Sequence, residues 1–241
     1  MRPLLLEALR VTLQNDIVEV FGKSGCGKSF FAGWMASKFK DRGKALVIWD
    51  KKNEYRGLAA SLLVLNQEAF AKVQKAKHEF FMRLLEAHPS IRIVPQGLTL
   101  DEMLEAYNEL AHAVYERGQA VLLTEEAHVV CPQGSTPRYA QILVTDARTN
   151  ANDLIFVTQR AQLLDTTIVS QGNVRVAFKM TDKNDLNRVV SFFQNPEPER
   201  FNNVGAFIAA MHPFQALYMN EKNGLEGVIH TNKITGFSHF G

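Results

Sequence analysis

The chain has 241 residues, of which 46% are hydrophobic and 22% are charged. This composition is typical of a globular protein and argues against a disordered one. The net charge of +2 neither requires nor excludes a nucleic-acid partner. The length predicts a single domain over residues 1–241, with a core at about 16–192 and a β extension with a tail at about 193–241.

The two cysteines, Cys26 and Cys131, are too few for a disulfide framework, which favours a reducing compartment. No window reaches the roughly 18 consecutive apolar residues that indicate a transmembrane helix. The chain begins MRPLLLEALRVTLQND, which has one run of three leucines and no cleavage site of a signal peptide. We therefore expect a soluble cytoplasmic protein with no transmembrane segment of its own.

Apolar runs that predict strands alternate with stretches of helical spacing. In chain order, strands are expected at residues 16–21, 45–49, 91–94, 120–123, 154–158 and 174–178. Helices are expected at 28–40, 66–88, 99–117 and 138–148, and short β segments at 205–211 and 214–219. One side of the 66–88 helix would carry Phe70, Val73, Lys77, Phe80, Phe81 and Leu84. This alternation predicts an α/β fold with a mostly parallel central sheet and helices on both faces.

Charge is unevenly distributed along the chain. Residues 23–56 contain nine Lys and Arg residues against three acids, whereas residues 99–126 contain seven acids against one arginine. Such runs indicate either solvated helix faces or surfaces that bind charged partners.

The strongest motif is the sequence GKSGCGKS at residues 22–29, which matches the pattern G-x-x-x-x-G-K-[ST] of a phosphate-binding loop. Glycines allow successive N–H groups to converge on phosphate oxygens, and the following helix directs the positive end of its dipole to the same place. Lys28 would contact the β- and γ-phosphates of ATP, and Ser29 would bind Mg²⁺. The predicted ATP-binding residues are Gly22, Lys23, Ser24, Gly25, Cys26, Gly27, Lys28, Ser29 and Phe30. Cys26 is interpreted as an ordinary loop residue rather than a nucleophile.

Two carboxylates end the apolar strand in VLLTEEAH, residues 121–128. The carboxyl end of a strand is the usual ligand-binding edge of an open α/β sheet. Glu125 is predicted to hold Mg²⁺ through its water shell, and Glu126 to polarise the attacking water. The alternative is that the two acids only cap a helix. Asp is usual at the first position, so Glu125 is a departure, and His128 is expected to orient or pack rather than to catalyse.

A polar amide follows the next buried strand in LIFVTQR, residues 154–160. Gln159 could hydrogen-bond the γ-phosphate or the attacking water without adding charge, which makes it a candidate sensor. Thr158 and Arg160 could instead simply terminate the strand.

Five segments, taken in chain order, resemble the HerA/FtsK superfamily of DNA-translocating ATPases. They read GKSGCGKS, WDKKNEY, VLLTEEAH, DARTNANDLIFVTQR and LLDTTIVSQGNVRVAFKMTDKNDLNRV, and they lie within residues 17–190. Many NTPases share the phosphate loop, whereas the last two segments are more specific. Asp50, Glu54 and Tyr55 resemble the second-strand motif of this superfamily, and residues 165–173 resemble the segment after its sensor strand.

The resemblance implies a RecA-like P-loop NTPase core that forms a homo-oligomer, expected to be a hexameric ring around double-stranded DNA. Active sites would lie between subunits, and an arginine of the neighbouring subunit would stabilise transition-state charge. Arg148 matches that arginine, in the helix before the sensor strand, and Arg160 is the second candidate. The alternative for Arg148 is a surface salt bridge.

Several domains that larger members of the superfamily carry are not visible in this sequence, which narrows the type of motor that we expect. Cellular HerA proteins carry a β-barrel before the ATPase core, and FtsK-type motors carry membrane spans and a winged helix. About 16 residues precede the first strand here, which is too few for a barrel. The remaining minimal motor resembles the genome-packaging ATPases of membrane-containing icosahedral DNA viruses. This implies packaging of a viral genome into a preformed capsid, with a capsid or portal vertex protein as partner, in the host cytoplasm or at the virion vertex.

Other functions stay open at this point. They are a cellular HerA-like translocase in repair or plasmid transfer, a P-loop kinase or metabolic ATPase, and a nucleotide-gated assembly protein.

A translocase must also hold DNA phosphates. The basic candidates are Lys51, Lys52, Arg56, Lys72, Lys75 and Lys77, which could equally be solvated surface residues.

Overall fold

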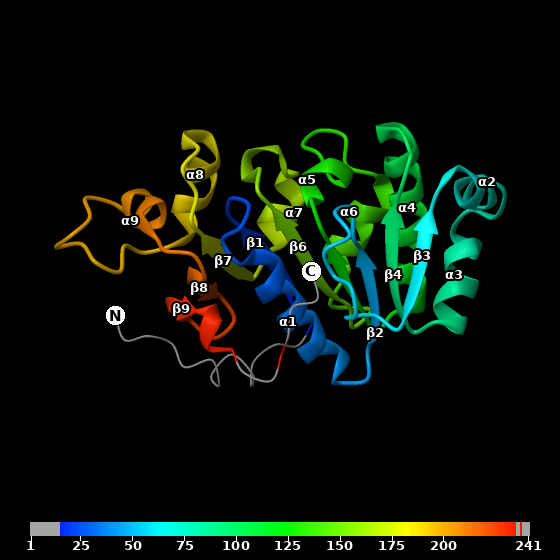
Figure 1. The fold of residues 1–241 in the computed structure, drawn as a ribbon, viewed down its shortest axis with the longest axis horizontal. Coiled ribbons are helices and arrows are strands. Elements are labelled where there is room, and N and C mark those ends of the chain that lie inside the picture. The colour runs from blue at the N-terminus through cyan, green and yellow to red at the C-terminus, as the bar shows by residue number, and fades with distance from the viewer. Residues whose placement is uncertain (1–14, 235–236, 238–241) are drawn as a thin grey trace.

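A computed structural model describes residues 15–234 and residue 237. Within this part of the chain, one nine-stranded sheet has the order β3-β4-β2-β5-β6-β1-β7-β8-β9 (Figure 1). Its strands are β1 (Ile17–Phe21), β2 (Ala45–Trp49), β3 (Ser61–Leu65), β4 (Ser90–Pro95), β5 (Ala120–Thr124), β6 (Asp153–Thr158), β7 (Val174–Phe178), β8 (Gln215–Asn220) and β9 (Leu225–His230). All pairs from β3 to β7 are parallel, and β8 and β9 add an antiparallel edge.

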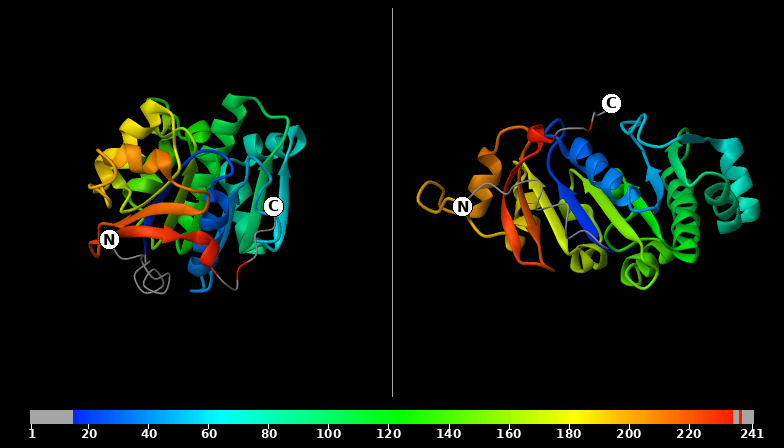
Figure 2. Two further views of the ribbon diagram at one scale, coloured as in Figure 1. Left: turned by 60° about the vertical axis from the view of Figure 1, so that its left-hand side comes forward. Right: turned by 90° about the horizontal axis from the view of Figure 1, so that it is seen from below.

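Helices connect the parallel strands and lie on both sides of the sheet (Figure 2). They are α1 (Lys28–Lys40), α2 (Gln67–Ala76), α3 (His78–Ala87), α4 (Leu100–Arg117), α5 (Ala127–Val130), α6 (Arg138–Thr145), α7 (Thr166–Gln171), α8 (Lys183–Val189) and α9 (Val204–Ala210). Short 3₁₀ helices are η2 (Ala161–Leu163), η3 (Val190–Phe192) and η4 (Thr231–Lys233). The α/β class expected from the alternating pattern is confirmed.

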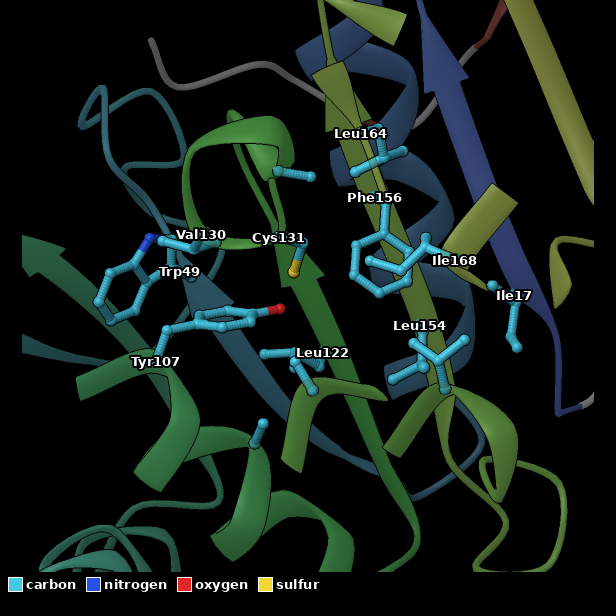
Figure 3. Packing of buried hydrophobic residues seen from close by; sticks show 14 of the residues in the cluster. Ile17, Trp49, Tyr107, Leu122, Val130, Cys131, Leu154, Phe156, Leu164 and Ile168 are labelled. Atoms are coloured by element: carbon cyan, nitrogen blue, oxygen red, sulfur yellow. The ribbon is translucent and has the colours of Figure 1, made fainter. Parts of the chain in front are cut away.

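The buried strands divide their side chains between two cores. Because successive residues of a strand point to opposite faces, Val18 and Val20 of β1 pack with α1, whereas Ile17 and Phe21 face the other helices. The larger core lies on that second face. Figure 3 shows Trp49, Tyr107, Leu122 and Phe156 packed within it. Residues buried on both faces explain why these strands read as continuous apolar runs.

The helix expected over residues 66–88 is two helices, so that expectation is wrong in detail. Lys77 has φ of 51° and separates α2 from α3. A single helix would place Lys77 on the same side as buried Phe70 and Val73. At the kink, its ammonium group instead reaches Glu105 at the surface, at 2.8 Å.

The segment 205–211 was expected to be a strand, and it is helix α9. Asn203 caps this helix by accepting a hydrogen bond from the backbone N–H of Ala206 at 2.9 Å. Its buried residues are Val204, Phe207, Ile208 and, just beyond the helix, Met211. Their spacing is that of one helix face. The expected strand at 214–219 is confirmed as β8, whereas β3, β9, α7 and α8 were not predicted.

In the part of the chain that the structure describes, no helix is both long enough and apolar enough to span a membrane. The expectation that the N-terminal segment is not a signal peptide falls on residues 1–14, which lie outside the described residues.

Candidate nucleotide-hydrolysis site

Four neighbouring parallel strands end at the same edge of the sheet, and the predicted site residues follow them. β1 leads into the phosphate loop, and β2 leads into residues 50–55. β5 leads into Glu125 and Glu126, and β6 leads into Gln159. The strand order β2-β5-β6-β1 therefore brings together four segments that are far apart in the sequence.

The phosphate loop needs glycine at two positions for steric as well as conformational reasons. Gly22 has φ of 148°, and a Cβ there would lie 2.7 Å from the Cβ of Phe178. Gly27 has φ of 104°, and a Cβ there would lie 2.8 Å from Cδ1 of Phe214. Larger residues would displace the loop from the N-terminus of α1, where N–H groups and the helix dipole attract phosphate.

Lys28 and Cys26 both bond back to the loop. Nζ of Lys28 donates to the carbonyl oxygen of Lys23 at 2.9 Å, and the Cys26 thiol donates to the same oxygen at 2.8 Å. Burial raises the pKa of the Cys26 thiol. A thiol held in its neutral form agrees with a structural loop residue and not with a nucleophile.

Glu54 lies beside Ser29, which makes its carboxylate a further candidate for binding Mg²⁺. The hydroxyl of Ser29 donates to Oε2 of Glu54 at 2.5 Å. Asp50 stabilises the turn that contains Glu54. Its carboxylate accepts hydrogen bonds from the backbone N–H groups of Glu54 and Tyr55 at 2.8 and 3.0 Å. Arg92 pairs with Asp50 at 2.9 Å. The acidic residue of the second-strand motif is thus placed beside the loop serine.

Glu125 is buried at the end of β5, with 1% of its surface exposed. Burial raises the pKa of Glu125 to about 7, against the opposing effect of a hydrogen bond from the Tyr55 hydroxyl. That hydroxyl donates to Oε2 of Glu125 at 2.8 Å. Oxygen ligands from Ser29, Glu54 and Glu125 are the donor type that Mg²⁺ prefers.

Glu126 has a strained backbone and several polar neighbours. Its φ of 51° places it in the left-handed region, which costs a non-glycine residue about 1 kcal/mol. Its Oε1 accepts a hydrogen bond from the Gln159 amide at 3.1 Å and forms an ion pair with Lys52. The predicted base and the predicted sensor are therefore in direct contact.

Lys52 links the two carboxylates, because its Nζ also lies 3.7 Å from Oε1 of Glu125. Burial would lower the pKa of Lys52, but the hydrogen bond and charge of Glu126, with those of Glu125 and Glu54, raise it overall. The sequence predicted Lys52 to be either a DNA contact or a solvated surface residue. In this conformation it is bound inside the site.

His128 lies behind Glu126. Its Nδ1 is 2.9 Å from Oγ1 of Thr158 and 3.3 Å from Oε2 of Glu126. Burial lowers the pKa of His128, while the Glu126 charge opposes this change. The ring is thus placed to orient Glu126, as expected for an orienting or packing residue.

A cavity of about 590 Å³ lies over the phosphate loop, within the size range of small-ligand sites. Its lining is Ser24, Gly25, Gly27, Lys28, Ser29, Phe30, Lys52, Glu54 and Phe214. Phe214 precedes β8, and its backbone N–H donates to the carbonyl oxygen of Cys26 at 2.9 Å. Phe214 is 40% exposed and lines the cavity, so its ring is available to contact a ligand. No motif in the sequence pointed to Phe214.

The two candidate arginines occupy different places. α6 ends at Thr145, so the helix expected over 138–148 is shorter than predicted, and Arg148 lies in the turn that follows it. Arg148 is exposed and precedes β6, whereas Gln159 follows β6. A strand of this length spans about 20 Å, so Arg148 lies at the edge of the sheet opposite its own phosphate loop. Arg160, beside Gln159, approaches Asp185 at 3.5 Å.

The remaining basic candidates are on the surface. Lys51, Arg56 and Lys75 are exposed. Lys72 is paired with Glu68 at 2.8 Å, and Lys77 with Glu105.

Residues 16–128 match the family model described as "Helicase HerA, central domain". This stretch contains the phosphate loop, the Asp50–Glu54 turn and the Glu125–Glu126 pair. Just under half of the chain is therefore similar to the central domain of the helicase HerA. A comparison with curated proteins found no match.

Solved structures with the same fold as this chain include a viral and two bacterial proteins. The genome packaging NTPase B204 from Sulfolobus turreted icosahedral virus 2, in complex with AMPPCP, has a TM-score of 0.62 and 15% identity, over 90% of this chain and 98% of that chain. VirB4 of Thermoanaerobacter pseudethanolicus has a TM-score of 0.60 and 13% identity, over 88% of each chain. The bacterial conjugative coupling protein TrwBdeltaN70 has a TM-score of 0.62 and 10% identity, over 90% and 84%. At these identities the likeness establishes the RecA-like fold.

Proposed function

We propose that this protein is a motor that hydrolyses ATP to translocate double-stranded DNA and that it packages a viral genome into a preformed capsid. The placement of arginine carries the proposal. Among the described residues that line the cavity, the cations are Lys28 and Lys52, and none is an arginine. Arg148 is exposed at the opposite edge of the sheet. A cavity whose lining contains no arginine is suited to completion by a neighbouring subunit, as in a ring that encircles DNA.

In the proposed mechanism, the phosphate loop and Lys28 bind the triphosphate, and Phe214 packs against the base. Ser29, Glu54 and Glu125 would hold Mg²⁺, which neutralises phosphate charge when bound. Glu126 accepts a proton from the attacking water, and Gln159 orients that water and Glu126 together. Arg148 of a neighbouring subunit stabilises the charge of the transition state.

Lys52 has a defined part in this scheme. Its ion pair with Glu126 occupies the carboxylate oxygen that the attacking water would need to contact. The γ-phosphate of ATP is a competing anion at the same cavity, which Lys52 also lines. We propose that ATP draws Lys52 away from Glu126 and thereby frees the base only when substrate is present.

Support for packaging comes from the extent of the likeness to B204, described as a genome packaging NTPase, of which 98% is covered. A second candidate is DNA transfer between cells, because TrwBdeltaN70, a conjugative coupling protein, has the same TM-score. Both candidates require a homo-oligomeric ring on duplex DNA. The packaging motor would in addition bind a capsid or portal vertex protein.

The test is the ATPase rate with and without duplex DNA. We expect duplex DNA of any sequence to stimulate hydrolysis, with a stimulation that falls steeply as salt rises, because phosphate contacts dominate such binding. Lys28→Ala, which removes the phosphate cation, is the inactive control. A rate that duplex DNA leaves unchanged at low salt would contradict the proposal. Co-sedimentation with preformed capsids would then separate packaging from conjugative transfer.

A further inference from the structure

Two histidines and a glutamate converge at the junction of α3 and α4, at a distance from the nucleotide site. His78 begins α3, and His112 and Glu116 lie one turn apart on α4. These helices pack near the β3–β4 end of the sheet (Figure 1). In the strand order, β4, β2, β5 and β6 separate β3 from β1, which carries the phosphate loop. We propose that His78, His112 and Glu116 bind a divalent transition-metal ion of the Zn²⁺ class.

The distances between the donor atoms suit one metal ion. Nε2 of His112 is 3.0 Å from Oε1 of Glu116, and Nε2 of His78 is 3.5 Å from its Oε2. One donor atom of each residue lies within 4.8 Å of the other two. Bonds of about 2.0–2.1 Å to a tetrahedral metal place its ligand atoms about 3.3 Å apart. The two histidine–carboxylate separations, which end on different oxygens of Glu116, fall on both sides of that value, and the donor atoms lie within 4.8 Å of one another, so side-chain rotation would bring them around one ion.

Packing holds the imidazole rings in place. The rings of His78 and His112 have centroids 3.9 Å apart, and the other side of His112 stacks on Tyr139 of α6 at 3.6 Å. Burial and the neighbouring His78 lower the pKa of His112. A neutral ring binds a metal through its unprotonated nitrogen, so Nε2 of His112, which faces the carboxylate of Glu116 here, would give up its proton on metal binding.

The donor set selects the type of ion. Imidazole nitrogens favour Zn²⁺ and its neighbours in the transition series over Mg²⁺ and Ca²⁺, which prefer oxygen. Two histidines and one carboxylate leave a fourth position open to water or to a further donor. The site also lies beside Glu105 and Glu109 on the acidic helix α4, whose charge attracts a cation.

The consequence of binding follows from the position of His78. It comes directly after Lys77, the residue with φ of 51° that separates α2 from α3. The polar contacts between this kink and α4 include the solvent-exposed Lys77–Glu105 ion pair and the approach of His78 to Glu116 at 3.5 Å. A metal shared by His78, His112 and Glu116 would tie α3 to α4 at the kink and stabilise this flank of the sheet.

The test is Zn²⁺ titration of the metal-stripped full chain in excess Mg²⁺ without nucleotide, followed by calorimetry and by the Tm. We expect one tight Zn²⁺ per chain and a higher Tm on binding. Glu116→Gln should weaken Zn²⁺ binding by at least about tenfold, since even the loss of an outer partner of a metal site costs that much. His112→Ala should weaken it further. His88→Ala, at the exposed far end of α3, is the matched control and should bind Zn²⁺ like the unchanged chain.

Glu116 is exposed, so we expect Glu116→Gln to retain the fold. If His112→Ala does not fold, Glu116→Gln alone tests whether these residues bind Zn²⁺. Equal Zn²⁺ affinity in the unchanged chain and in Glu116→Gln would overturn the proposal. So would a Tm that Zn²⁺ leaves unchanged, or an equal loss of binding in His88→Ala. The three residues would then form only a hydrogen-bonded cluster.

Discussion

The buried carboxylate of Glu125 should destabilise the metal-free protein at neutral and alkaline pH. Burial raises its pKa from 4.5 to about 7. A carboxyl group whose pKa is raised in the folded state favours folding when it is protonated. That contribution is fully present below the unfolded-state pKa and is lost as the pH rises through the folded-state value. Glu125→Gln removes the titration and keeps an oxygen that can accept the Tyr55 hydrogen bond.

The magnitude follows from the difference between the two pKa values. A pKa that rises from 4.5 to about 7 corresponds to about 3 kcal/mol at pH 8, since each pH unit between the two values is worth about 1.36 kcal/mol. At pH 5 the same linkage gives less than about 1 kcal/mol, because most of the folded protein still carries the proton. We therefore expect Glu125→Gln to raise the free energy of unfolding at pH 8 by about 3 kcal/mol. For a chain of this size, that corresponds to a rise in Tm of roughly 6–12 °C.

The assay is urea unfolding at pH 5 and pH 8, in EDTA and without nucleotide. Glu86→Gln is the matched control, because Glu86 is exposed on α3 and its substitution should change the free energy of unfolding little at either pH. The same Glu125→Gln variant should need more Mg²⁺ for hydrolysis. A stability difference that is equal at the two pH values, or a variant less stable than the unchanged chain at pH 8, would refute the reasoning.

Three further substitutions test the other parts of the site. Lys52→Ala should raise the KM for ATP by about tenfold and change ADP affinity little, because a charge-assisted contact to the γ-phosphate is worth about 1.5–3 kcal/mol. Equal losses of affinity for ATP and ADP would count against the proposed movement of Lys52. Phe214→Ala should weaken ATP binding by about tenfold and leave inorganic triphosphate binding unchanged, because stacking on a base is worth about 1–3 kcal/mol. An equal loss of affinity for both ligands would mean that Phe214 only supports the phosphate loop. Arg148→Ala should lower the rate of ATP hydrolysis by about 10³-fold or more and leave nucleotide affinity nearly unchanged. Mixing this variant with Lys28→Ala should restore some single-turnover hydrolysis. No recovery in proven mixed rings would place the role of Arg148 within its own chain.

The parts of the site that depend on local sequence were predictable. The glycines of the phosphate loop and the carboxylates after β5 are short patterns next to apolar runs, so their positions at one edge of the sheet follow from the parallel strand order. The fold class followed for the same reason. The acidic helix was also well defined, since Thr99 and Glu102 form a capping box before α4 and Gly118 ends it.

Contacts between distant segments were not predictable. The bonds from Ser29 to Glu54 and from Lys52 to Glu126 depend on how the turn after β2 folds over the loop, which no local pattern encodes. Phe214 reaches the nucleotide site from the antiparallel edge of the sheet.

Local features of the sequence explain why strand β3 and helix α9 were not predicted. Leu62 and Val64 of β3 are exposed, so this edge strand lacks the sequence contrast of a half-buried one. In α9, Gly205 and a short length obscured the helical spacing of its buried residues.

The central claim is that hydrolysis at this site moves the protein along duplex DNA. The most direct measurement is displacement of a labelled third strand from a linear duplex by the assembled protein. We predict ATP-dependent release of the third strand by the unchanged chain and none by Glu126→Gln, which should bind ATP without hydrolysing it. Full ATP hydrolysis on the same duplex with the third strand still bound would contradict the account.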